Sequence, residues 1–209
     1  MNSFSLLEEI WHAVTHGLGL FLSIVGLVVL VSFATLGGSK IAIASSAVYG
    51  ASLILMYGSS TLYHAITHKK VKGLFQTFDH ASIYVLIAGT YTPISLVTLN
   101  GAWGYSLASA VWATAIFGVY MKFKYPNRFE TLSLVLYLLM GWSVVVAISP
   151  LRDSFATGGF YLLVAGGLAY TFGVYYYIND SKPFYHAIWH LFVLAGSVFH
   201  FFMTLFYII

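Results

Sequence analysis

The sequence contains no cysteine, which excludes disulfide bonds, thiolate metal ligands and cysteine nucleophiles. Charged residues are also scarce, at 7% of the 209 residues, whereas 60% of the residues are hydrophobic. Soluble domains carry about 25% charged residues, so a soluble protein of this composition would have too few to cover its surface. The mean hydropathy of +0.87 agrees with this reasoning. We therefore predict a polytopic membrane protein.

Basic residues are few as well, and the net charge is only +3. They lie in short segments between hydrophobic runs, a pattern that reports membrane orientation rather than nucleic-acid binding. We therefore expect no nucleic-acid partner. The N-terminal region lacks the basic residues of a secretory signal and carries Glu8 and Glu9 instead. We expect residues 1–16 to form an interfacial amphipathic segment, with apolar side chains between Phe4 and Val14.

Seven hydrophobic segments are separated by turn and charge signals. The shortest separation is Asn100-Gly101, but residues 80–121 are too many for one bilayer crossing. All the connections are short, so neighbouring helices are antiparallel and there is no room for a second domain. Pro93 is expected to loosen or kink the third span. The sequence predicts an all-α, integral membrane seven-transmembrane-helix bundle in a single domain, 1–209, with spans near 17–36, 41–66, 80–99, 102–121, 131–149, 158–178 and 184–209.

The lysine and arginine residues are distributed unevenly between the two sides of this bundle. The second, fourth and sixth loops hold seven of them, and the first, third and fifth hold Lys40 and Arg152. Because basic loops stay in the cytoplasm, we predict a cytoplasmic N-terminus and a C-terminus outside. The seven are Lys69, Lys70, Lys72, Lys122, Lys124, Arg128 and Lys182.

Histidines, a carboxylate and a serine are expected to meet at one membrane level. His186 and His190 are four apart at the start of the seventh span, so they share one helix face. His64 and Ser60 end the second span and Asp79 opens the third. The predicted topology brings all five to the cytoplasmic side. Ionisable residues inside a membrane usually face a bundle interior or a cavity.

Three imidazoles without a thiolate suit zinc with one coordination position left for water. Zinc would lower the pKa of that water and polarise a substrate carbonyl. Asp79 would then act as a general base, or would only orient a ligand or the water. Ser60 would donate a hydrogen bond to a developing oxyanion, or would serve helix packing. The simpler alternative is that each histidine separately forms a hydrogen bond with a neighbouring helix.

Other histidines are assigned different places. His12 and His16, also four apart, either line the same cavity, form a second metal site, or do neither. His200 lies roughly 15 Å beyond His190 along the helix and on another face, which favours an interhelical hydrogen bond. His80 is expected to face a neighbouring helix or lipid headgroups.

These motifs resemble a known family. Ser60-Thr61-Leu62-Tyr63-His64, Phe78-Asp79-His80 and His186-Ala187-Ile188-Trp189-His190 are similar to the pattern of the progestin and adipoQ receptor family. The N-terminal stretch Glu9 to Gly17 is closest to its bacterial branch, the hemolysin III or membrane-homeostasis proteins. The resemblance implies a zinc ion held by His64, His186 and His190 near the cytoplasmic face, with Asp79 and Ser60 beside it. The wider superfamily includes ceramidase-like membrane hydrolases.

Two classes of function follow. The first is a zinc-dependent hydrolase of a lipid amide or ester in the bacterial inner (plasma) membrane, or a lipid sensor in membrane homeostasis on the same scaffold. Its partners would be membrane lipids, one of them a substrate. The alternative is a pore-forming cytolysin without enzymatic activity. The spans argue against it, because they lack the polar stripe that lines an aqueous channel.

Overall fold

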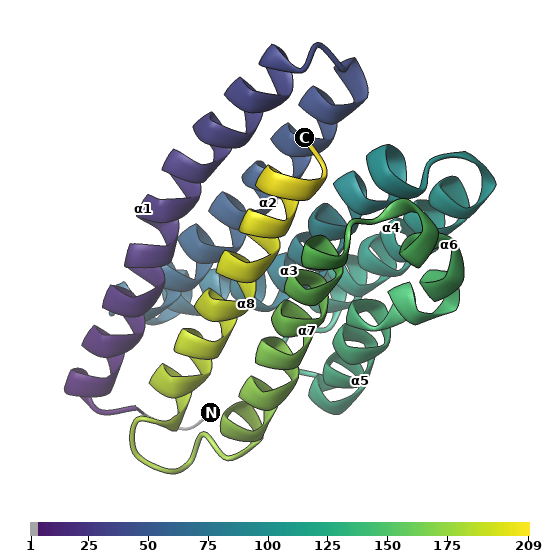
Figure 1. Cartoon of the computed structure of the whole chain (residues 1–209). Coiled ribbons are helices and arrows are strands. Elements are labelled where there is room, and N and C mark those ends of the chain that lie inside the picture. Colours follow the sequence, from purple (N-terminus) through teal and green to yellow (C-terminus); the bar gives the residue numbers. More distant parts are fainter. Residues whose placement is uncertain (1–3) are drawn as a thin grey trace.

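The structure, a computed structural model, describes residues 4–209 and is all-α over that range (Figure 1). Seven helical stretches in it are long and apolar enough to cross a membrane, which confirms the predicted number of spans. Five are single helices and two are composite, the third and the fifth. The elements are α1 Leu6–Leu36, α2 Lys40–Ala65, α3 Lys69–Pro93, η1 Ile94–Leu99, α4 Gly101–Lys124, α5 Glu130–Gly141, η2 Ser143–Ala147, α6 Ile148–Ser154, α7 Thr157–Ile178 and α8 Tyr185–Tyr207.

Helix α1 begins at a capping box and runs without a break to Leu36. The Ser5 side chain accepts a hydrogen bond from the Glu8 backbone N–H, and the Glu8 carboxylate accepts one from the Ser5 backbone. This arrangement satisfies two of the N–H groups that every helix start leaves free. Residues 6–16 thus form the first turns of helix α1. The sequence had predicted a separate interfacial segment there. Residues 1–3 of that predicted segment lie outside the described range.

The third span changes its helix type after Pro93. The α-helix ends at Pro93, and the chain continues as the π-helical element η1 to Leu99. Proline lacks the N–H that an α-helix needs at this point, which agrees with the predicted loosening. Asn100 then adopts a left-handed φ of 50° and its side chain accepts a hydrogen bond from the Gly101 N–H. The expected break at Asn100-Gly101 is confirmed.

The fifth span is composite because Tyr91 of α3 interrupts its backbone ladder. The Tyr91 hydroxyl donates to the carbonyl of Gly141 (2.7 Å) and accepts from the N–H of Val144 (2.9 Å). These two bonds satisfy the groups left free where α5 ends and the 3₁₀ element η2 begins.

Helix α8 lies between α1 and α7 (Figure 1), and α1 packs against both α2 and α8. The start of α1, the end of α2 and the start of α8 consequently meet at one end of the bundle. Glycine allows close approach of α1 and α2, because a Cβ on Gly19 of α1 would collide with the ring of Tyr57 of α2. The site described below depends on this closely packed end.

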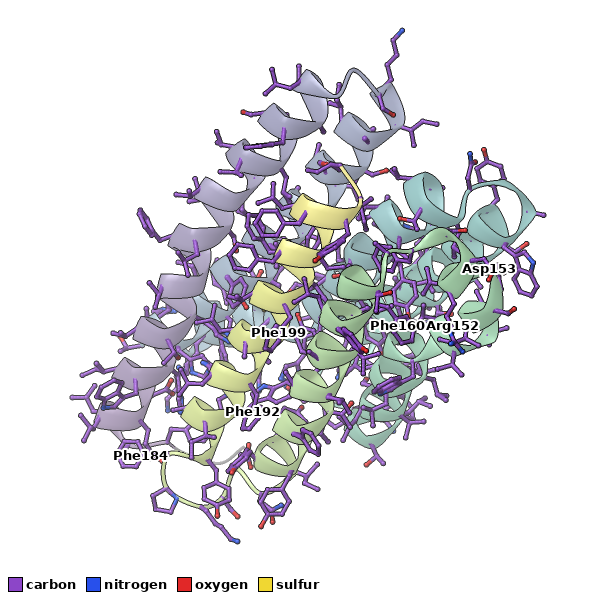
Figure 2. All side chains as sticks on the ribbon, viewed as in Figure 1. Arg152, Asp153, Phe160, Phe184, Phe192 and Phe199 are labelled. Atoms are coloured by element: carbon purple, nitrogen blue, oxygen red, sulfur yellow. The ribbon has the colours of Figure 1, made fainter. Side chains whose placement is uncertain are left out.

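The outer surface is covered by large apolar side chains (Figure 2). Phe21 of α1, Ile116 of α4 and Phe172 of α7 are exposed by 63%, 67% and 61% respectively. An aqueous surface would not carry so many exposed apolar groups, whereas a surface in contact with lipid chains requires them. The protein is a multi-pass membrane protein.

Candidate metal centre

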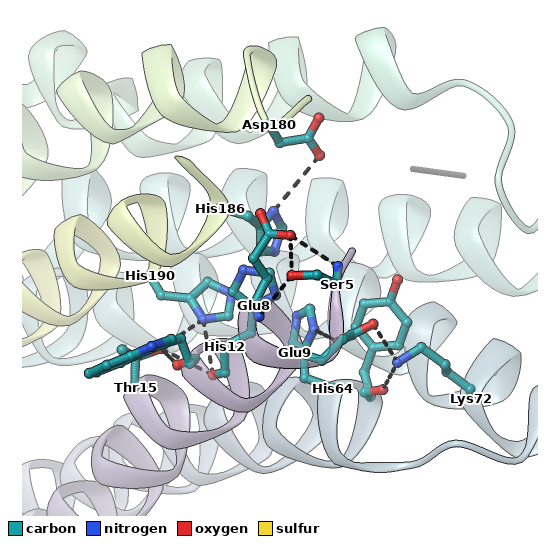
Figure 3. Close-up of polar contacts among 12 residues, drawn as sticks. Ser5, Glu8, Glu9, His12, Thr15, His64, Lys72, Asp180, His186 and His190 are labelled. Carbon is teal, nitrogen blue, oxygen red and sulfur yellow. Dashed lines mark hydrogen bonds and ion pairs between the residues drawn. The ribbon is translucent and has the colours of Figure 1, made fainter. Parts of the chain in front are cut away.

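Three of the predicted site histidines meet where α2 ends and α8 begins (Figure 3). His64 lies in the last turn of α2, and His186 and His190 lie in the first turns of α8. One possible ligand atom from each lies within 4.8 Å of the other two. His64 and His190 are buried, and His186 is partly buried. This group, called the histidine triad below, could hold a metal ion.

Glu9 orients His64. A carboxylate oxygen of Glu9 lies 2.7 Å from Nδ1 of His64. Nδ1 therefore carries the proton and donates a hydrogen bond to the carboxylate. The other carboxylate oxygen of Glu9 pairs with Nζ of Lys72 at 3.0 Å. Nε2 of His64 is then the unprotonated nitrogen, and it has no hydrogen-bond partner among residues 4–209. Metal-binding histidines commonly have such a carboxylate on the second nitrogen.

The Nδ1 atoms of the two α8 histidines also face polar atoms of the protein. Nδ1 of His190 lies 3.2 Å from the His12 carbonyl and 3.1 Å from the Thr15 hydroxyl. Both can accept its proton, since the Thr15 hydroxyl donates to carbonyls of α1. Nδ1 of His186 lies 3.8 Å from a carboxylate oxygen of Asp180. In His64 and His190, Nδ1 lies within hydrogen-bond distance of an acceptor on the protein, which leaves Nε2 of these two rings for a metal. Nδ1 of His186 has no hydrogen-bond partner among residues 4–209.

The triad therefore fits the metal that the sequence predicted. A buried polar atom without a partner costs about 1–3 kcal/mol, and Nε2 of His64 is such an atom within the described chain. A metal ion would satisfy it and would also bind one ring nitrogen of His186 and one of His190. The donor set consists of three imidazoles, and in His64 and His190 the second nitrogen already faces a protein acceptor.

Asp79 and Ser60 lie beside the triad rather than in it. Both are buried, and both line a cavity of about 120 Å³ that also reaches His186 and His190. Neither belongs to the two groups of converging ligand atoms found among the described residues. The rest of the cavity wall is largely apolar and aromatic, and includes Leu86, Tyr91, Trp142, Tyr170, Trp189 and Val193. The cavity thus joins a polar end to an apolar interior.

The structure brings further residues into the cluster that the sequence did not assign to it. The ring centre of His12 lies 4.7 Å from that of His64, and the His16 ring stacks on His190 at 3.5 Å. Of the alternatives left open for this pair, His16 lines the same cavity. His12 does not line it, but forms with Glu9 and His64 a second group of side chains that could hold a metal ion. Glu9 was not predicted to be a residue of the site. The available signal was its position one turn before His12 on a common helix face.

The remaining histidines are close to their predicted environments. Nε2 of His200 in α8 lies 3.2 Å from the Leu163 carbonyl of α7, which confirms the expected interhelical hydrogen bond. His80 faces a neighbouring helix, with Nδ1 3.6 Å from a carboxylate oxygen of Glu130.

Comparisons with known proteins agree on one family. Residues 4–201 match the family described as "Haemolysin-III related". The chain is 48% identical over 204 residues to the hemolysin-3 homolog of Bacillus subtilis (strain 168), covering 98% of this chain and 96% of that protein. It is 46% identical over 202 residues to hemolysin-3 of Bacillus cereus, covering 97% and 92%. It is 31% identical over 161 residues to the human monocyte to macrophage differentiation factor, covering 74% and 66%.

Proposed function

The chain belongs to the haemolysin-III related family, and we propose that it is a zinc-dependent hydrolase of a lipid amide or ester in the bacterial plasma membrane. The observation that carries this proposal is the histidine triad next to a cavity lined by Asp79 and Ser60. A metal-binding group, a carboxylate and a hydroxyl beside an apolar cavity are the parts that hydrolysis of a lipid requires.

His64, His186 and His190 would hold the zinc ion through one ring nitrogen each, which is Nε2 for His64. When bound, zinc supplies a Lewis acid that polarises a carbonyl group and makes water more acidic. Glu9 and the His12 carbonyl orient the rings of His64 and His190, since each lies within hydrogen-bond distance of Nδ1 of one ring. This fixed orientation is the contribution of the protein to metal affinity.

Asp79 is the general base in this proposal. Its carboxylate is buried and lines the cavity beside His186 and His190, so it can accept the proton of a water molecule that attacks the substrate. The same proton then goes to the leaving amine or alcohol. Ser60 lines the cavity as well, and its hydroxyl lies beside the Asp79 carboxylate. In this proposal the hydroxyl donates to the carbonyl oxygen as negative charge develops there.

The apolar cavity wall would select an acyl chain and exclude water. Its lining continues past the site to His200, which is more than two helical turns from His190 on α8. An acyl chain lying along this path would have its carbonyl group at the polar end.

The lysine and arginine distribution supports an orientation with the site on the cytoplasmic side. In that orientation the N-terminus is cytoplasmic and the C-terminus lies outside. Substrate would then come from the inner leaflet of the plasma membrane.

The test combines metal analysis with a hydrolysis assay on the purified full-length protein in mild detergent. We expect about one zinc ion per chain, lost in His64→Ala and His190→Ala, and zinc-dependent hydrolysis of an N-acyl amide or a fatty-acyl ester that releases a fluorescent group. Metal binding with lipid binding but no turnover would favour a lipid sensor. Absence of metal in chelator-free wild-type protein would remove the hydrolase proposal.

The names of the two Bacillus relatives favour a second candidate, a pore-forming cytolysin. Dye release from liposomes containing the protein tests it directly. Rapid release that persists in His190→Ala would support a pore. Intact liposomes together with hydrolysis by the same preparation would reject it.

A further inference from the structure

His80 of α3 contacts both the cavity and an ion pair that lies outside it. Its side chain lines the cavity together with that of Asp79, the preceding residue. On its other side, Nδ1 lies 3.6 Å from a carboxylate oxygen of Glu130, the first residue of α5. The same oxygen accepts a hydrogen bond of 2.7 Å from Nζ of Lys122 on α4. His80 thus connects the cavity to a charged group that the proposed reaction does not use.

Helix α5 contacts His80 at two points. The Tyr137 hydroxyl donates a hydrogen bond of 2.7 Å to the His80 carbonyl, while Glu130 faces the His80 ring. Glu130 and Tyr137 are about two turns apart on α5. Tyr137 also lines the cavity. These contacts fix the position of the His80 ring between the cavity and Glu130.

Exposure increases along this line of side chains. Asp79 is buried, the His80 side chain is 18% exposed and that of Glu130 is 40% exposed. Glu130 directly follows the basic fourth loop, which places it near the membrane surface. In the orientation that the basic loops support, this is the cytoplasmic surface. A proton that passes from Asp79 through His80 therefore moves from the buried site toward water.

An imidazole is suited to this step, because it can receive a proton on one ring nitrogen and release another from the second. With Nδ1 of His80 facing Glu130, Nε2 is the nitrogen left to receive a proton from the cavity side. The Glu130 carboxylate stabilises the protonated ring, and Lys122 holds that carboxylate in place. The separation of 3.6 Å is longer than a hydrogen bond, as is common for catalytic contacts before substrate binds.

Hydrolysis of an ester leaves one proton to be removed from the site. Water and an ester give a carboxylic acid and an alcohol, and the acid ionises at neutral pH, so each turnover releases a proton. An amide gives a carboxylic acid and an amine. An alkyl amine takes up the proton of the acid and carries it away as an ammonium ion. A route for protons is therefore required for an ester and not for an amide of an alkyl amine.

We propose that His80 transfers the proton released by ester hydrolysis from Asp79 to the cytoplasmic surface, with Glu130 stabilising the protonated ring. The proposal rests on the proposed function, because that hydrolysis supplies the proton. The product carboxylic acid gives its proton to the Asp79 carboxylate, and Asp79 passes it to Nε2 of His80 directly or through one water molecule. Nδ1 then releases its own proton to water beside Glu130. Asp79 is again ionised and His80 again neutral, and proton exchange with water restores the starting tautomer of the ring.

Two substrates with the same fatty-acyl chain test this on the zinc-loaded, full-length protein in detergent. One is the ester of an alkyl alcohol and the other the amide of an alkyl amine, and the released fatty acid is measured by mass spectrometry. In His80→Gln we expect kcat for the ester to fall roughly 10²-fold, the lower end of what a positioned proton-transfer group contributes. The kcat for the amide should stay at the wild-type value, which also shows that the variant is folded.

Two further measurements separate proton transfer from a structural role. The solvent isotope effect on kcat for the ester should be larger in His80→Gln than in the wild type, because proton transfer becomes rate-limiting. Added imidazole, at a concentration that leaves the wild-type rate unchanged, should restore part of the ester rate in His80→Gln by carrying the proton. Glu130→Gln should slow the ester reaction more than the amide reaction.

His68→Gln is the matched control, because His68 is an exposed histidine that directly precedes α3 and does not line the cavity. It should leave both rates unchanged. Equal losses for the two substrates in His80→Gln, or no loss for the ester, would overturn the role of His80 and leave the hydrolase function intact. Wild-type activity on the amide alone would also overturn it, because that reaction leaves no proton to be removed. A wild type that hydrolyses neither substrate would overturn both proposals.

Discussion

Nδ1 of His64 lies 2.7 Å from a carboxylate oxygen of Glu9, although 55 residues separate the two in the chain. The contact joins the first turns of α1 to the last turn of α2 and determines which nitrogen of His64 is available to a metal. Lys72 approaches the other Glu9 oxygen at 3.0 Å, so the carboxylate has a cationic partner on its outer side. The sequence motif that contains His64 does not contain Glu9, which shows that the site extends to α1.

Replacing Glu9 should weaken metal binding without removing a ligand. In Glu9→Gln the His64 ring loses its charged acceptor, and we expect a roughly 10–100-fold lower zinc affinity, measured by competition with a chromophoric chelator. Glu8→Gln is the control, because it removes the same charge from the adjacent position, and glutamine also serves in a capping box. Equal affinities for Glu9→Gln and the wild type would argue against an orienting role.

Removal of the metal should destabilise the wild type but not the triad variants. A ligand that binds only the folded state adds about 2.7 kcal/mol when its free concentration is 100 times its Kd. We therefore expect a chelator to lower the apparent Tm of the wild type in detergent, as followed by loss of circular dichroism on heating. His190→Ala should unfold at the same temperature with and without chelator. A chelator response that persists in His190→Ala would indicate a metal bound elsewhere.

Asp79 and Ser60 should affect turnover more than metal content. Loss of a general base costs about 10²–10⁴-fold in rate, and loss of one oxyanion donor about 10²–10³-fold. We expect Asp79→Asn and Ser60→Ala to retain about one zinc ion per chain while kcat for the acyl substrate falls by these factors. Ser59→Ala is a suitable control, because the neighbouring hydroxyl of Ser59 donates to the Leu55 carbonyl within α2. Loss of zinc in Asp79→Asn would instead make Asp79 a ligand.

Lys122 of α4 and Glu130 of α5 form an ion pair in which only the lysine is buried. Their side chains meet at 2.7 Å, and that of Lys122 is only 3% exposed whereas that of Glu130 is 40% exposed. Removing one partner of a buried pair costs about 3–5 kcal/mol. Because Glu130 is partly solvated, we expect Glu130→Ala to fall at or below the lower end of that range. Lys122→Met combined with Glu130→Leu should recover most of the loss.

A double-mutant cycle of thermal unfolding in detergent measures the Lys122–Glu130 coupling. If the losses in unfolding free energy of the two single substitutions add up to that of the double substitution, the two side chains have no coupling energy. His80 lies 3.6 Å from the same Glu130 oxygen, so His80→Gln should be included to separate the two contacts.

Much of the candidate site follows from local patterns. The i, i+4 spacing of His186 and His190 places both on one face of any helix, whatever the packing. His64 lies at the end of α2, and short antiparallel connections bring it to the same membrane level as the start of the last span. Asp79 lies ten residues inside α3, which begins at Lys69 and not near residue 80 as the sequence predicted. Glu9, His12 and His16 could not be assigned in this way, because the neighbours of α1 in the bundle are not encoded in any local repeat.

The sequence by itself determined that this is an all-α membrane protein with seven spans and that three histidines share one level of the bundle. A bilayer forces long apolar segments into helices, since backbone groups in lipid must be bonded internally, and helix geometry then sets the height of each side chain. Only the tertiary structure decided that α1 packs against both α2 and α8. That contact depends on the summed packing of many side chains, and it brings Glu9 and His12 to the triad.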